Sequence, residues 1–150
     1  MSLQKRIDED VIKALKSGEK DTVTTLRGLN SDIKYYRINN QIEELKDDDI
    51  IKVLSSAAKQ RRDSIEKFQQ GGRDDLVQKE TAELALITAY LPEQLSPEEI
   101  ERLVVEVIGE TGAAGMSDMG KVMKAVMPRT KGQADGKVIK EIVSRLLSQA

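Results

Sequence analysis

The chain has 150 residues, of which 39% are hydrophobic, 33% charged and only 3% aromatic, and its formal net charge is −2. It contains neither cysteine nor histidine, which excludes disulfides, thiolate chemistry and the imidazole that most often serves as general base or metal ligand. A charge-rich, aromatic-poor chain with regular apolar spacing is typical of an all-α protein, and this one is too apolar for a disordered protein.

Four amphipathic helices are predicted in the first part of the chain, because apolar residues recur there at intervals of three and four. These helices cover residues 3–17, 21–42, 47–70 and 76–91. Asp21 is expected to cap the second helix, and Gly71-Gly72 breaks the third. Pro92 ends the fourth, because proline cannot continue a helix.

The stretch LPEQLSPEE marks the clearest boundary in the chain. Ser96 as N-cap, Pro97 at the first helical position and Glu99 as the capping-box partner together predict a strong helix start. Three helices are expected after the boundary. They run from 97 to 108, from Ser117 or Asp118 to Pro128, and from Asp135 to the C-terminus. We therefore predict an all-α fold of two helical subdomains, with four helices in residues 1–92 and a three-helix bundle in residues 93–150.

Charged residues interrupt the apolar stripes of the third and fourth predicted helices. Arg61 lies on the stripe of the third helix and Glu80 on that of the fourth. If the two helices fold back on each other, Arg61 or Arg62 comes near Glu80 or Glu83. We expect an ion pair across this hairpin, because a partly buried charge needs a partner. The alternative is that Arg61 extends to solvent.

Motifs for chemistry are weak in this sequence. Residues 115–121 (GMSDMGK) match the G-x-x-x-x-G-K of a phosphate-binding loop, but Val122 stands where a Mg²⁺-binding hydroxyl belongs, and no strand is predicted before the loop. The aspartates at 47–49 are better explained as helix-start acids than as a metal site. No nucleophile and base are recognisable together. We predict no catalytic residue, no metal and no cofactor.

The N-terminal sequence MSLQKRIDED is charged and amphipathic, and no apolar run approaches the length of a membrane-spanning helix. We therefore expect a cytoplasmic protein with no membrane contact.

The C-terminal part is basic although the chain as a whole is slightly acidic. Residues 93–112 have a net charge of −5, and residues 113–150 have a net charge of +4. One amphipathic pattern occurs twice, from Gly120 and from Gly136. Each copy places two lysines opposite its apolar stripe, with Val122 and Val138 at equivalent inward positions. The turn PRTKG adds two more cations. Six basic residues would surround this corner: Lys121, Lys124, Arg129, Lys131, Lys137 and Lys140.

Two interpretations of these basic residues remain open. Lysines opposite an apolar stripe are ordinary on a solvated helix face. The alternative is a surface that contacts the phosphates of RNA or DNA by shape and charge, since the segment has no aromatic residue for base stacking.

Several stretches of the chain resemble the YqeY-like family. They are the segment from Asp118 to Gly136 (DMGKVMKAVMPRTKGQADG), AYLPEQL at 89–95, KQRRDSI at 59–65 and the opening MSLQKRIDED. The resemblance covers essentially the whole chain. The family is similar to the C-terminal tail of the GatB component of the glutamine-dependent tRNA amidotransferase, which implies two all-helical subdomains and a tail that grips tRNA.

The resemblance implies a non-catalytic module that binds tRNA or another structured RNA through the six basic residues. By similarity, the resemblance also implies a carbon–nitrogen ligase activity with glutamine as the amido donor. We find no residues in this sequence that could perform that reaction. The alternative is a protein-interaction module that docks on a translation or amidotransferase component, with the helix of Tyr35-Tyr36 as its surface.

Overall fold

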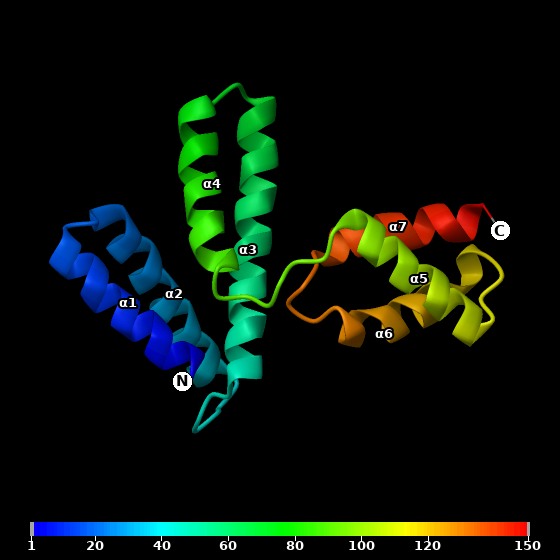
Figure 1. Cartoon of the computed structure of the whole chain (residues 1–150), viewed down its shortest axis with the longest axis horizontal. Helices are drawn as coiled ribbons and strands as arrows, with labels where there is room; N and C mark the ends of the chain where they lie inside the picture. The colour runs from blue at the N-terminus through cyan, green and yellow to red at the C-terminus, as the bar shows by residue number, and fades with distance from the viewer. Residues whose placement is uncertain (1, 150) are drawn as a thin grey trace. The chain divides into compact units, whose positions relative to one another are not determined.

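The computed structural model describes residues 2–149, and the chain divides into two compact units, Met1–Leu91 and Pro92–Ala150. The described residues form seven α-helices and one short 3-10 helix, with no β-strand (Figure 1). The helices are α1 (Leu3–Ser17), α2 (Lys20–Asn39), α3 (Asp47–Gln70), α4 (Asp74–Thr88), α5 (Pro97–Thr111), η1 (Met116–Asp118), α6 (Met119–Arg129) and α7 (Gly136–Ser148). The predicted all-α fold is confirmed. No described helix is both long and apolar enough to cross a membrane.

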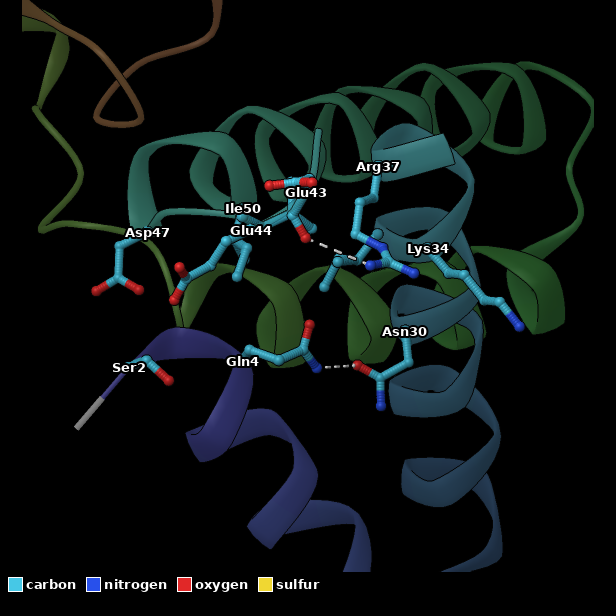
Figure 2. A pocket seen from close by; sticks show the side chains of 11 residues that line it. Ser2, Gln4, Asn30, Lys34, Arg37, Glu43, Glu44, Asp47 and Ile50 are labelled. Carbon is cyan, nitrogen blue, oxygen red and sulfur yellow. Dashed lines mark hydrogen bonds between the residues drawn. The ribbon is translucent and has the colours of Figure 1, made fainter. Parts of the chain in front are cut away.

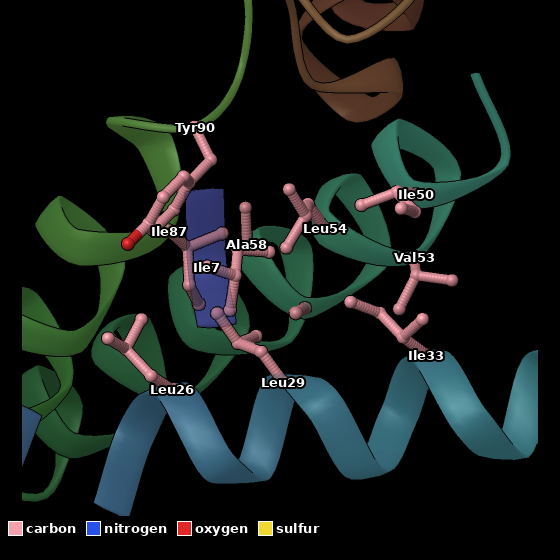
Figure 3. Close-up of a cluster of buried hydrophobic side chains, with 11 residues drawn as sticks. Ile7, Leu26, Leu29, Ile33, Ile50, Val53, Leu54, Ala58, Ile87 and Tyr90 are labelled. Atoms are coloured by element: carbon pink, nitrogen blue, oxygen red, sulfur yellow. The ribbon is translucent and has the colours of Figure 1, made fainter. Parts of the chain in front are cut away.

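The first unit consists of two helical hairpins, α1–α2 and α3–α4 (Figure 1). Gly18 turns the chain between α1 and α2 with φ of 74°, and Gly72 adopts φ of 67° between α3 and α4, a conformation that glycine reaches without steric cost. Aliphatic side chains of α1, α2, α3 and α4 meet in one core (Figure 3). Its buried residues are Ile7, Leu26, Leu29, Ile33, Ile50, Val53, Leu54, Ala57, Ala58, Ile87 and Tyr90.

The far half of the α3–α4 hairpin is a two-helix arm, residues 59–86. The structure describes all of these residues, and none of their side chains is fully buried. Arg61 Nε is shielded from solvent and lies 3.4 Å from Glu83 Oε2, and each of the two side chains is 20% exposed. The predicted ion pair is therefore confirmed, with Glu83 rather than Glu80 as the acid. It links the two helices of the arm.

The second unit packs α5, α6 and α7 around a separate core. The α5 start is the predicted capping box, because Ser96 Oγ accepts from Glu99 N at 3.2 Å and Glu99 Oε2 accepts from Ser96 N at 3.4 Å. Asp135 caps α7 by accepting from Lys137 N at 3.1 Å. The core residues are Ile100, Val104, Val107, Val122, Val126, Ile139, Ile142, Val143 and Leu147.

Candidate nucleic-acid interface

The corner between α6 and α7, residues 129–137, is built around a β-turn. Gln133 N donates to Thr130 O at 2.8 Å, and Gly132 has φ of 74° at the third position of the turn, where glycine is favoured. Thr130 is only 2% exposed, and its hydroxyl lies within hydrogen-bonding distance of the carbonyls of Val126 and Met127. The turn therefore holds Lys131, its second residue, at the surface.

The corner is cross-linked to the segment that precedes α5. Gln94 Nε2 donates to Gly132 O at 2.7 Å and to Pro92 O at 2.9 Å. Leu95 N donates to Gln133 O at 2.8 Å, and Gln133 Nε2 donates to Glu93 O at 3.3 Å. Helical periodicity predicts this segment as a helix boundary and does not link it to the corner. The one signal that could have linked it to the corner is that both stretches carry the same family resemblance.

All six predicted basic residues are exposed, but they do not form one cluster. Arg129, Lys131 and Lys137 lie in the corner, and Lys140 follows one turn later on α7. Lys121 is eight residues before Arg129 on α6, which places it about 12 Å away along the helix axis. Lys124 lies between them. The corner therefore presents three of the six cations.

Lys121 and Arg129 are bound to groups of α5 inside the second unit. Lys121 Nζ donates to Thr111 O at 2.9 Å, at the end of α5, where helix carbonyls lack partners and a positive charge is favourable. Arg129 forms a two-bond ion pair with Glu110, at 2.6 Å for Nη2–Oε2 and 3.4 Å for Nη1–Oε1. This hydrogen-bonded pair lowers the pKa of Glu110 and raises the pKa of Arg129. Glu110 thus neutralises Arg129, and a backbone carbonyl at the end of α5 binds Lys121.

The two glycines of the corner differ in what they require. Gly132 needs its left-handed conformation. Gly136, the first residue of α7, does not: a Cβ there would only contact Met127 Cε at 3.6 Å, an ordinary packing distance.

The phosphate-loop pattern at 115–121 folds differently from a nucleotide cradle. It forms η1 and the first turn of α6, and Lys121 is bound to α5.

A cavity of about 530 Å³, lined by both polar and apolar residues, lies in the first unit, beside the start of α1 and the loop before α3 (Figure 2). Gln4 Nε2 donates to Asn30 Oδ1 at 2.9 Å, and Arg37 Nη1 donates to the Glu43 carbonyl at 3.5 Å. Leu3 N donates to Asp47 Oδ1 at 3.1 Å. These hydrogen bonds link α1 to α2, α1 to the start of α3, and α2 to the loop before α3.

The outer face of α2 carries exposed apolar side chains. Tyr35 is 68% exposed and Ile38 is 60% exposed, whereas Tyr36 packs against the core of the first unit. A groove of about 260 Å³ beside Tyr35 is also lined by Lys52 and Gln60 of α3. This face differs from the basic corner, because an aromatic ring and amides line it.

A model of the family described as Yqey-like protein matches residues 4–147. The chain belongs to this family. This Yqey-like chain is 38% identical over 85 residues to "Altered inheritance of mitochondria protein 41, mitochondrial" of Eremothecium gossypii, a match that covers 57% of the chain and 46% of that protein. It therefore spans less than half the length of that relative. It is 29% identical over 147 residues to the protein of the same name from Pyrenophora tritici-repentis, covering 96% and 78%.

A more distant relative supports the predicted link to an amidotransferase. The Yqey-like chain is 28% identical over 132 residues to one component of the glutamyl-tRNA(Gln) amidotransferase of Aeropyrum pernix, which covers 85% of this chain and 19% of that protein. The expected family and its relation to the amidotransferase are confirmed.

The expected cytoplasmic localisation is contradicted by these matches, because both protein 41 relatives are named as mitochondrial. The expectation relied on finding no apolar targeting run. Mitochondrial transit peptides are amphipathic and rich in arginine, so that search carries no information about them.

Proposed function

We propose that this Yqey-like protein is a non-catalytic module that binds tRNA, or another structured RNA, through backbone phosphates at the α6–α7 corner. The observation that carries the proposal is the exposed Lys131 on a hydrogen-bonded turn, with Lys137 and Lys140 following on α7. The similarity to a protein whose name refers to glutamyl-tRNA(Gln) supports tRNA as the nucleic acid.

The composition of the second unit favours phosphate contact over base recognition. Residues 113–150 contain no aromatic side chain on which a base could stack. Lysine binds phosphate as a flexible point charge, and each contact releases counterions from the nucleic acid. Binding should therefore depend steeply on salt and weakly on sequence. We assign the phosphate contacts to Lys121, Lys124, Arg129, Lys131, Lys137 and Lys140. Contact through Lys121 or Arg129 competes with its bond to Thr111 O or Glu110.

The test is a fluorescence-polarisation titration of labelled bulk tRNA between 50 and 200 mM KCl, a range over which phosphate contacts weaken strongly. The variant is Lys131→Glu with Lys137→Glu. Its control is Lys5→Glu with Lys20→Glu, which makes the same charge change at two exposed helix-start positions of the first unit, where acids are tolerated.

The corner variant should bind at least about tenfold more weakly, and the slope of log K against log salt should flatten by somewhat under two units. The control should retain most of the wild-type affinity. Equal losses in the two variants would assign binding to net charge and remove the corner from the proposal.

A second candidate function is docking on a protein of the translation or amidotransferase machinery through the outer face of α2. The exposure of Tyr35 and Ile38 favours it, because aromatic residues are enriched at protein interfaces. Affinity capture with wild type and with Tyr35→Ser plus Ile38→Ser, each with and without ribonuclease, tests this function. A partner that survives ribonuclease and is lost in the variant supports docking. Capture that ribonuclease abolishes counts against it.

A further inference from the structure

We infer that Gln94 is a positioning residue, which fixes the turn that carries Lys131 for contact with RNA phosphate. This role rests on the proposed function. The basis is the pair of short hydrogen bonds from one carboxamide nitrogen to Gly132 O and Pro92 O, at 2.7 and 2.9 Å. The Gln94 side chain is partly buried and uncharged, so it acts on the turn through these hydrogen bonds and makes no ionic contact with phosphate.

The chemistry of the carboxamide suits this position. Both acceptors are backbone carbonyls, so the group between them must supply two N–H donors. A glutamate would set a carboxylate against two carbonyl oxygens, and an aliphatic side chain would leave both unsatisfied by this residue. The bond from Leu95 N to Gln133 O and the bond from Gln133 Nε2 to Glu93 O lie directly beside it. Three hydrogen bonds therefore join residues 93–95 to the turn.

The turn needs such support because of Gly132. Glycine loses more conformational freedom on ordering than any other residue, so a glycine turn left to itself would sample many orientations. Cross-links made in the free protein order the turn before RNA arrives, which reduces the entropy lost on binding. Removing them should weaken RNA affinity without changing the number of phosphates contacted.

The test variant is Gln94→Met, which keeps the length of the side chain and removes both donors. Amide hydrogen exchange, followed by NMR, should be roughly tenfold faster at Gln133 and Leu95, and unchanged at core amides such as Val104. Affinity for bulk tRNA should fall about three- to tenfold with an unchanged salt slope. Lys131→Met should instead flatten the slope by somewhat under one unit, because it removes a phosphate contact. Gln78→Met, on the exposed face of α4, is the matched control and should behave as wild type.

Each outcome is decisive. Unchanged exchange in Gln94→Met would show that Gln94 does not order the turn, and faster exchange with wild-type RNA affinity would overturn the positioning role. A flattened slope in Gln94→Met would mean that Gln94 acts at a phosphate contact instead. If the wild-type protein does not bind tRNA, the proposed function and this role fall together, whereas equal binding by wild type and Gln94→Met removes the role alone. Gln133→Met, which breaks the bond to Glu93 O, should cause smaller changes of the same kind: faster exchange and weaker tRNA affinity with an unchanged salt slope. This variant provides the test if Gln94→Met does not fold.

Discussion

Glu110 occupies the Arg129 guanidinium in a two-bond ion pair at the edge of the corner. We predict that Glu110→Gln frees Arg129, tightens tRNA binding about three- to fivefold and steepens the salt slope by up to about one unit. Glu101→Gln is the matched control, since it frees Arg145, at the other end of α7 from the corner. Equal gains from the two variants would show that only net charge matters.

We expect the buried Tyr90 to make the stability of the first unit depend on pH in the alkaline range. Its hydroxyl donates to Asp10 Oδ2 at 2.5 Å, and the Arg6 guanidinium lies 4.8 Å from its ring centre. Burial, followed by the bond to Asp10, raises the pKa of Tyr90 above its ordinary value of about 10. A group whose pKa is raised in the folded state contributes stability that is fully present below the unfolded pKa. This contribution is lost as the pH rises beyond that value.

We therefore expect the free energy of unfolding of wild type to fall above about pH 10 more than that of Tyr90→Phe. At pH 7 the variant should be less stable by about 1–3 kcal/mol, because Asp10 loses its donor. Urea unfolding of both proteins at pH 7, 9 and 11 measures the difference. Parallel decline in both proteins would rule out Tyr90 as the titrating group.

A side-chain contact could be predicted from the sequence where the partner is close in sequence or lies across a predicted hairpin. Other contacts could not be predicted. Arg61 and Glu83 could be paired because Gly71-Gly72 fixes the fold-back of two regular helices. Glu110 and Gln94 could not be assigned, because no predicted hairpin placed them opposite Arg129 and Gly132. Helical periodicity gives the face of a side chain but not the helix opposite it.

The stability of the arm formed by α3 and α4 should depend more on the ion pair between Arg61 and Glu83 than on any single apolar contact. Arg61→Met leaves Glu83 without its cation in a side-chain environment that is only 20% exposed. We expect a loss of about 2 kcal/mol in arm stability, largely recovered in Arg61→Met with Glu83→Leu, because replacing both charges removes the unpaired one. Hydrogen-exchange mass spectrometry of arm peptides checks this. A double variant as unstable as the single variant would show that the apolar parts of the two side chains matter instead.

Helix starts and stops were predicted best where a local signal controls them. The capping box before α5, the Asp135 cap of α7 and the break at Gly71-Gly72 all appear as expected. The predicted Asp21 cap was wrong: the N-cap of α2 is Glu19, two residues earlier, and it makes no side-chain cap bond. Pro128 lies inside the last turn of α6 rather than ending it.

The repeated pattern of α6 and α7 also fails as a guide to packing. Val122 is fully buried, but Val138, its counterpart, is only partly so, and Ile139 occupies the inward position of α7. The same local pattern is rotated because the two helices meet different neighbours. A repeat in sequence predicted two amphipathic helices correctly and their orientation incompletely.

Each of the two units has its own apolar core, so the chain should not unfold as a single cooperative system. We predict that residues 92–150 expressed alone form a helical domain with a cooperative thermal transition, monitored by circular dichroism at 222 nm. Its stability should be modest, since a domain of about 60 residues buries only about 60% of its surface. A fragment that is helical but melts without cooperativity would show that the second core depends on the first unit.

The arm at residues 59–86 should determine where proteolysis of the native protein begins. Because none of its side chains is fully buried, the arm should open at a free-energy cost well below that of unfolding the core of the first unit. Opening would expose backbone around Gly71-Gly72 to proteases while Ile7, Leu29 and Leu54 stay packed. The first cut in the native protein should therefore fall at the arm tip and leave two fragments held together by an intact core.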